Sequence, residues 1–362
     1  MRRTLLPLLI TLPLFAFANP FRDDPVLGEG EFYQEEPVRT PQEIQLDLEE
    51  NERLFETAQE MFNPWYAGPL LTGGAHMMPP GYANIQPYIF ATDNYSAWNS
   101  KRKTVHTPHR WVLNPSVTGL QFGLTNWLDM IIALQGLASW QSGQHGGGFG
   151  DTMVGIGFPI LKEDLNLPAI KFVFNEFFPT GKYQRLNPRK IGLDATGAGS
   201  FQNQFGLRIS KLFFWSHKHP VNLRALYSYT IPTDVHVRDF NAYGGGYGTA
   251  GKVSPGNSQQ FDAAMEYSFT QQWVFALDAV YTWSHKTKFH GTPGTTSSGA
   301  TAAVGGGSSD QLSFAPAIEY NPTPNLNFLA GVWFDVYGRN TSKFVSGIIS
   351  MSLTFNVSRA KD

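Results

Sequence analysis

A long series of segments in which apolar and polar residues alternate constrains this chain most. From Phe261 to Phe269 every odd-numbered residue is apolar, whereas the even-numbered ones include Asp262, Glu266 and Ser268. A period of two is that of a strand with one apolar and one polar face. The same pattern predicts about twelve strands, near residues 82–94, 111–125, 128–140, 149–161, 169–179, 200–214, 220–232, 259–269, 273–284, 310–320, 326–337 and 343–357.

These segments are long for the strands of a soluble protein, which usually run to about five or six residues. At ~3.3 Å per residue and ~40° tilt, eleven residues rise about 28 Å, which matches the ~25 Å apolar band of an outer-membrane barrel. A soluble β-sandwich would not need so many long strands with aromatic ends. The sequence therefore predicts an all-β fold, a transmembrane antiparallel up-and-down β-barrel of about twelve strands over residues 81–357, with a tail at 358–362.

The connections support this topology. Three tight turns, at 125–127, 270–272 and 323–325, share a Thr, with an aromatic residue before the turn and a bulky apolar residue after it. Between them lie long polar loops at 233–258 and 285–309, as when short turns face the periplasm and loops face outward. With an even strand number, both chain ends then lie on the periplasmic side. The turn-flanking aromatic residues predict a periplasmic-side girdle of Phe122, Trp127, Tyr267, Trp273 and Tyr320.

The first eighteen residues have the form of a signal peptide. Arg2 and Arg3 precede an apolar stretch that ends in Ala16-Phe17-Ala18, an A-x-A cleavage pattern. We therefore expect an exported protein with a periplasmic leader over 19–80. Within the leader, Thr40 and Glu43 form a capping box that predicts an amphipathic helix near 41–62, with its apolar residues on one stripe.

Composition excludes several classes of function. The chain has no cysteine, which excludes thiolate metal sites and a cysteine nucleophile, and its 27 Lys+Arg against 29 Asp+Glu argue against nucleic-acid binding. The pair His217 and His219 is better explained by a solvated periplasmic turn than by a metal site. No G-x-S-x-G or comparable arrangement marks a barrel-borne lipase. We expect no enzyme activity, no metal and no cofactor.

Alternation also assigns the residues that face the barrel interior. By parity, the predicted lumen-lining residues are Asp129, Gln135, Asp151, Gln202, Gln204, Arg208, Asn222, Arg224, Asp262, Glu266, Asp278, Glu319 and Asp335. Carboxylates outnumber arginines in this set, so an open interior would favour cations or neutral solutes over anions. The alternative is a filled interior in which Arg208 and Arg224 pair with Glu266 and its neighbours, because an unpaired charge in a tight lumen is costly.

Short motifs add a family resemblance. Phe122-Gly123-Leu124-Thr125-Asn126, Phe149-Gly150-Asp151-Thr152 and Phe178-Pro179-Thr180-Gly181 resemble the outer-membrane transporter family named for the meta-pathway of phenol degradation. The resemblance spans roughly residues 64 to 357. It implies a barrel of about this strand number and a role in passing small, often hydrophobic or aromatic, compounds. The helix at 41–62 is not part of the family pattern.

Together these observations predict a monomeric outer-membrane pore or transporter that passes small solutes by passive diffusion. Its partners are outer-membrane lipid, lipopolysaccharide and the solute. Pro179, Thr180 and Gly181 are expected to shape a strand-to-loop exit or a gate, and the 41–62 helix is hypothesised to occupy or cover the lumen. The alternative is a barrel-anchored surface protein whose long loops bind a partner without transport. A sealed barrel whose loop deletions abolish partner binding would favour that alternative.

Overall fold

The computed structural model describes residues 40–62, 65–214, 216 and 219–357. The predicted signal peptide at 1–18, the leader before Thr40 and the tail at 358–362 lie outside the described residues, as does His217. The predicted helix is confirmed as α1 (Pro41–Phe62), and its capping box forms as expected. The Glu43 carboxylate accepts a hydrogen bond from the Thr40 N–H (2.7 Å), and the Thr40 hydroxyl accepts one from the Glu43 N–H (3.3 Å). Among the described residues, no helix combines the length and apolar character needed to cross a membrane.

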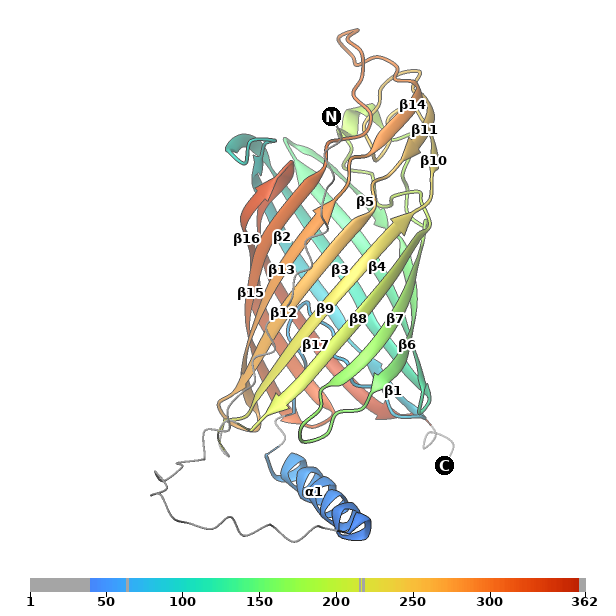
Figure 1. Ribbon diagram of the computed structural model, residues 1–362. Coiled ribbons are helices and arrows are strands. Elements are labelled where there is room, and N and C mark those ends of the chain that lie inside the picture. The colour runs from blue at the N-terminus through green and yellow to red at the C-terminus, as the bar shows by residue number, and fades with distance from the viewer. Residues whose placement is uncertain (1–39, 63–64, 215, 217–218, 358–362) are drawn as a thin grey trace, which may run out of the picture. The chain divides into compact units, whose positions relative to one another are not determined.

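A closed antiparallel β-barrel contains most of the described chain (Figure 1). Apart from two interrupted strands, each wall strand is hydrogen-bonded to the wall strands before and after it in the sequence, which gives an up-and-down order. The wall consists of β1 (Tyr82–Ile85), β2 (Pro87–Trp98), β3 (Thr104–Thr125), β4 (Leu128–Gln141), β5 (Gln144–Phe149), β6 (Thr152–Leu161), β7 (Ala169–Phe178), β8 (Gln202–Phe213), β9 (Val221–Pro232), β12 (Ser258–Ser268), β13 (Trp273–Ser284), β15 (Ser309–Thr323), β16 (Leu326–Arg339) and β17 (Thr341–Asn356).

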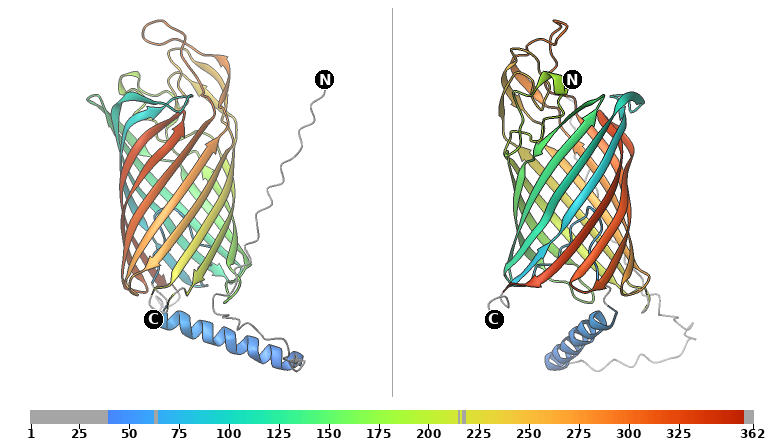
Figure 2. Two further views of the ribbon diagram at one scale, coloured as in Figure 1. Left: turned by 60° about the vertical axis from the view of Figure 1, so that its left-hand side comes forward. Right: turned by 180° about the vertical axis from the view of Figure 1, so that it is seen from behind.

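The twelve predicted strands are confirmed, although two of them are interrupted. β1 and β2 together form the first strand, which breaks at Gln86, and both segments pair with β17 to close the barrel. β5 and β6 together form the fourth strand and both pair with β4. Figure 2 shows the strands running obliquely around a continuous wall.

The two faces of the wall differ in polarity. On β17, Ser346, Ser350 and Ser352 are buried, whereas Val345 and Ile349 are exposed. This is the reverse of a soluble protein, because the apolar side chains point outward and the polar ones point inward. An apolar exterior of this kind faces lipid.

The shared Thr of the tight turns has a specific role. The Thr270 hydroxyl accepts hydrogen bonds from the N–H groups of Gln272 (3.2 Å) and Trp273 (3.0 Å), and the Thr323 hydroxyl accepts one from Leu326 (3.1 Å). Thr125 accepts from Trp127 in the same way (3.2 Å). Each Thr therefore satisfies backbone donors that the hairpin leaves unpaired, which explains the sequence repeat.

The prediction that residues 233–258 and 285–309 are only loops was wrong. They contain a separate three-stranded sheet of β10 (Val235–Arg238), β11 (Ala250–Ser254) and β14 (Lys288–Thr292). Three valines of this sheet, Val235, Val237 and Val253, are buried and form an apolar cluster. These segments are short and Gly-rich, so their alternation is too brief to stand out from the surrounding sequence.

Candidate functional site: the lumen and its extracellular mouth

A segment between α1 and the first strand lies inside the barrel, and we call residues 65–80 the strap. Its backbone N–H groups donate hydrogen bonds to side chains of the wall. Ala67 donates to Glu319 Oε2 (2.9 Å), Thr72 to Asp278 Oδ1 (2.9 Å) and Met78 to Asp129 Oδ2 (3.2 Å), while Ala75 donates to the Ser210 hydroxyl (2.9 Å). Because the strap has no regular secondary structure, these acceptors replace the ladder partners that its backbone lacks.

The strap glycines face the lumen arginines. A Cβ on Gly73 would lie 2.8 Å from the Arg208 guanidinium carbon, and one on Gly74 would lie 2.8 Å from Arg224 Nη1. Only a residue without a side chain lets the guanidinium groups approach the backbone this closely. Leu70 is buried in an apolar cluster with wall residues that include Ala276 and Ala315. The strap is therefore fitted to this interior by both polar and apolar contacts.

Two ion pairs lie beside the strap. Lys171 Nζ is 2.6 Å from Asp129 Oδ2 and donates to the His76 carbonyl (3.3 Å), with both charged side chains buried. Arg224 binds Glu266 through Nε (2.6 Å) and Nη2 (3.0 Å). Such a two-point arrangement is among the strongest ionic contacts in proteins.

Other interior side chains form hydrogen bonds to carboxylates of the same wall. Asn222 Nδ2 donates to Glu266 Oε2 (2.7 Å), and Gln260 Nε2 donates to Asp262 Oδ2 (2.8 Å). Lys171 was absent from the predicted lining. Its position between Ile170 and Phe172, at the same parity as Asn175, is the signal that could have found it.

The sequence suggests the 41–62 helix as the segment that occupies or covers the lumen. The hydrogen bonds described above come instead from the strap, which follows that helix in the chain. The signal in the sequence is the Gly and Pro content of the strap, at Gly68-Pro69, Gly73-Gly74 and Pro79-Pro80. These residues suit an irregular, closely packed backbone. Such composition also occurs in ordinary linkers, so it does not by itself place the segment inside the barrel.

An acidic side chain in a turn at the periplasmic end of the barrel holds the strap through His76. Glu163, in the turn between β6 and β7, lies 2.7 Å from His76 Nε2 and accepts the Leu212 N–H (2.6 Å). Burial opposes ionisation of Glu163, but the hydrogen bonds from His76 and Leu212, with the charge of Lys211, outweigh it and lower the pKa of Glu163. The carboxylate is therefore held ionised at neutral pH.

Above the strap the lumen wall is polar and largely uncharged. Gln204 accepts from Asn175 Nδ2 (2.8 Å) and donates to the Thr230 hydroxyl (3.2 Å). Gln202 and Gln204 line a recess of about 260 Å³ with Ser and Thr residues of β9, β12 and β13. Gln135, on β4, accepts from Asn114 Nδ2 (3.2 Å). This part of the lumen wall offers hydrogen-bond donors and acceptors, and neither positive nor negative charge predominates in it.

At the rim of the barrel, acidic side chains accept hydrogen bonds from neighbouring residues or form ion pairs with them. Asp335 accepts hydrogen bonds from the Trp98 indole and from the Phe344 N–H (2.6 Å). Asp310 is paired with both Arg102 and Arg339. Arg102, in the turn between β2 and β3, is thus used for a contact within the barrel.

The residues expected to shape an exit or gate begin the loop between β7 and β8. The Thr180 hydroxyl donates to the Gly150 carbonyl (2.8 Å), and the Gly181 N–H donates to Asp151 Oδ1 (2.9 Å). Pro179 precedes them directly after β7. These bonds tie the loop to the start of β6, and a gating role stays a prediction.

The five aromatic residues predicted for the girdle lie at or beside the short turns. Trp127, Trp273 and Tyr320 are exposed, and the rings of Trp273 and Tyr320 have centroids 4.6 Å apart. Phe122 and Tyr267 are half-buried. The girdle stays a prediction, in which these rings mark the periplasmic boundary of the lipid.

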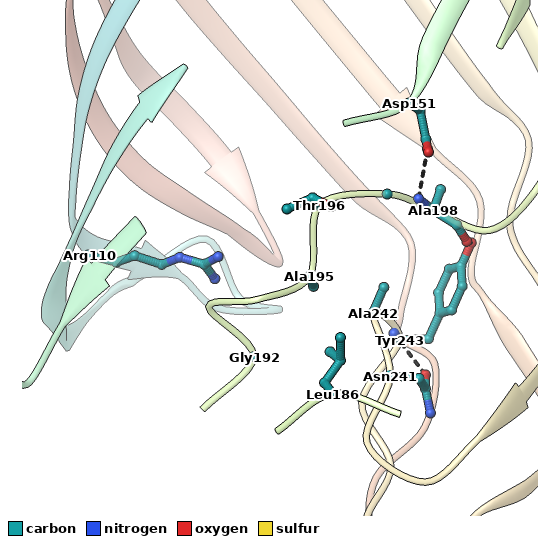
Figure 3. Close-up of a pocket in the computed structure, with 11 residues that line it drawn as sticks. Arg110, Asp151, Leu186, Gly192, Ala195, Thr196, Ala198, Asn241, Ala242 and Tyr243 are labelled. Carbon is teal, nitrogen blue, oxygen red and sulfur yellow. Dashed lines mark hydrogen bonds between the residues drawn. The ribbon is translucent and has the colours of Figure 1, made fainter. Parts of the chain in front are cut away.

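A pocket of about 550 Å³ lies at the extracellular mouth (Figure 3). On one side is Arg110 of β3, and its guanidinium points toward the stretch from Gly192 to Thr196. On the other side are Leu186 and the 241–243 segment, which includes Tyr243. Arg110 was not among the predicted lining residues, although its parity on β3 equals that of Asn114.

The described residues contain no group of three or more His, Asp or Glu side chains able to hold a metal ion. The described member of the predicted His pair, His219, contacts the Ser268 carbonyl through Nδ1 (3.0 Å) and stacks on Tyr267.

Comparison with known proteins agrees with this architecture. A family model described as "Putative MetA-pathway of phenol degradation" matches residues 102–351. The chain belongs to this family. The predicted resemblance is thereby confirmed, and the match covers the barrel from the first extracellular turn into β17. No curated protein matches the sequence.

Solved structures resemble this family member at the level of the fold. An outer-membrane channel from Pseudomonas putida F1 aligns with a TM-score of 0.57 and 15% identity, over 78% of this chain and 98% of that chain. The NanC porin (TM-score 0.37, 10% identity, 75% and 98% coverage) and the translocator domain of the autotransporter NalP from Neisseria meningitidis (0.40, 10%, 86% and 96%) are more distant. The closed wall with an apolar exterior makes this family member a multi-pass outer-membrane β-barrel.

Proposed function

We propose that this protein is a monomeric, non-enzymatic channel that passes small solutes across the outer membrane by passive diffusion. The observation that carries the proposal is the space left in the barrel. A cavity of about 770 Å³ surrounds the strap and is lined by both strap and wall residues. A barrel that served only as an anchor would be expected to fill its interior with its own side chains, as eight-stranded barrels do.

The proposed solutes are small, neutral or weakly charged molecules, including aromatic ones. The predicted lumen-lining residues support this proposal. Asp129 and Glu266 are in ion pairs, Asp278 and Glu319 accept strap N–H groups, and all four carboxylates are buried, so none of them is exposed to a solute while the strap is in place. The polar recess around Gln204 offers hydrogen bonds to hydroxyl and amide groups. The family description points in the same direction for aromatic compounds.

The strap sets the conductance in this proposal. It is held by separate hydrogen bonds and a few apolar contacts rather than by a continuous ladder, so it can shift without unfolding the wall. Movement of the strap would widen the path past Arg208 and Arg224. Pro179, Thr180 and Gly181 would keep the outer loop fixed while the strap moves.

A designed disulfide tests the proposal. The native chain has no cysteine, and the Ala75 N–H donates to the Ser210 hydroxyl (2.9 Å), so Ala75→Cys with Ser210→Cys places two thiols at a contact between the strap and β8. In liposomes, the reduced double variant should swell in arabinose and in a neutral phenyl glycoside, and oxidation should slow swelling. Each single cysteine variant is the control and should not respond to oxidation.

Two outcomes would count against the proposal. If neither wild type nor the reduced variant admits any solute, the barrel is an anchor. If swelling is rapid and oxidation leaves it unchanged, solutes pass without strap movement and the strap is a fixed part of the wall.

The small outer sheet favours one rival function. β10, β11 and β14 have their own buried valine cluster, so the long loops present a folded surface that could bind a partner. Deleting residues 285–308 would distinguish the two. Loss of a surface interaction with unchanged swelling supports the rival, and altered swelling supports the channel.

A further inference from the structure

The extracellular pocket contains a cation without an anionic partner. Among the described residues, Arg110 forms no ion pair, and its Nε atom is buried without a hydrogen-bond acceptor. Buried donors are normally satisfied, so an unsatisfied one needs an explanation. A guanidinium group presents its N–H groups in a planar fork that matches a carboxylate at two points. Arg110 therefore has the chemistry of a carboxylate anchor.

The opposite wall of the pocket is built close to Arg110 and is held rigidly. A Cβ on Gly146 of β5 would lie 2.5 Å from the Leu193 backbone, so this glycine lets the loop between β7 and β8 fold inward against the barrel. The loop is then fixed by Asp151, which accepts N–H groups from Gly181 (2.9 Å) and Ala198 (2.8 Å). Both Asp151 oxygens are used, and Figure 3 shows this carboxylate directed toward Ala198.

The remainder of the lining is apolar or already satisfied. Leu186 is buried, and Ala195 and Ala242 contribute small side chains. The Tyr243 hydroxyl donates to the Ala198 carbonyl (2.7 Å), which leaves its ring as a flat surface at the pocket wall. A pocket with one cation and an otherwise small, partly aromatic lining suits a compact aromatic acid.

We propose that this pocket binds the carboxylate of a small aromatic acid at Arg110 before the solute enters the lumen. The use of such a site in uptake rests on the proposed channel function, whereas binding itself does not. A measurement of binding in detergent can therefore fail without affecting the swelling result, and the reverse also holds.

The test is isothermal titration of the folded mature protein with benzoate and with benzamide, its neutral isostere. We expect saturable benzoate binding, with benzamide at least about tenfold weaker, since charged hydrogen bonds contribute that much. Arg110→Gln should weaken the binding of benzoate at least about tenfold and leave the binding of benzamide unchanged. Arg110→Lys keeps the positive charge but loses the two-point geometry of the guanidinium group. Its benzoate affinity should lie between those of wild type and Arg110→Gln.

Arg189→Gln is the matched control, because Arg189 is an exposed cation on the same loop that does not line the pocket. It should leave benzoate affinity unchanged. Equal benzoate affinity in wild type and Arg110→Gln would overturn the proposal, as would an equal loss in Arg189→Gln. Inorganic phosphate that binds more tightly than benzoate would overturn the assignment to a carboxylate. Heat-modifiable gel mobility confirms that each variant is folded.

Discussion

The cations Lys171 and Arg224 of the lower lumen and Arg110 of the extracellular mouth differ in their partners. In the lower lumen, Lys171 is paired with Asp129, and Arg224 with Glu266, and further carboxylates hold the strap. At the mouth, Arg110 faces a pocket without an anionic partner among the described residues. Beside the strap, Lys171 and Arg224 are each matched with a carboxylate at short distance, although Arg208 has no ion pair among the described residues and its Nε atom is buried without an acceptor. Where a solute would first enter, one charge is left available.

The sharpest test of this comparison is the loss of the buried cation in the lower lumen. Lys171→Met leaves Asp129 as an uncompensated buried charge, which should lower the free energy of unfolding by about 3–5 kcal/mol. Denaturant unfolding in lipid vesicles measures it. The double variant with Asp129→Asn should recover much of the loss, because no buried charge then remains unpaired. A single variant as stable as wild type would show that the pair does not organise this region.

A change of one methyl group tests how tightly the strap is packed. A Cβ on Gly123 would lie 1.9 Å from the Pro79 carbonyl oxygen, so Gly123→Ala should displace the end of the strap. We expect a loss of about 1–3 kcal/mol from overpacking and faster liposome swelling. Gly347→Ala is the control, because its added Cβ meets nothing within 4 Å. Equal behaviour of the two variants would mean that the strap is not in close contact with β3.

The contribution of Glu163, in the periplasmic turn between β6 and β7, to the stability of the protein should depend on pH. The pKa of Glu163 is lowered in the folded state, so its contribution is present above the unfolded pKa, about 4.3. It is lost as the pH falls through the lower folded value. Glu163→Gln should therefore be less stable than wild type at pH 7, with the difference shrinking below about pH 4. Unfolding midpoints from pH 3 to 7 measure this, and a difference that stays constant would exclude linkage to this carboxylate.

The smallest effect is expected at the mouth. Arg110→Gln removes a cation that has no ion pair within the described structure, so the free energy of unfolding should change by no more than about 0.5 kcal/mol. The same denaturant titration used for Lys171→Met provides the comparison. A loss comparable with that of Lys171→Met would show that Arg110 has a structural partner, and the contrast between the two regions would fail.

Several parts of this protein could be predicted from sequence because they depend on local patterns. The wall strands follow from alternation, the helix from the capping box at Thr40 and Glu43, and the tight turns from a Thr such as Thr270. The buried or half-buried positions of the proposed lining residues follow from parity once a strand is assigned. Each of these features depends on residues within one strand, turn or helix.

The strap and the mouth depended on contacts between distant residues. The hydrogen bond from Thr72 to Asp278 joins residues separated by 206 positions, and no local pattern in either segment indicates it. The role of Gly146 likewise appears only when Leu193 lies against it. By itself the sequence determined an exported twelve-stranded barrel with polar residues facing inward. Only the tertiary structure decided which carboxylates hold the strap and that Arg110 faces a pocket, because irregular segments are placed by long-range hydrogen bonds rather than by periodicity.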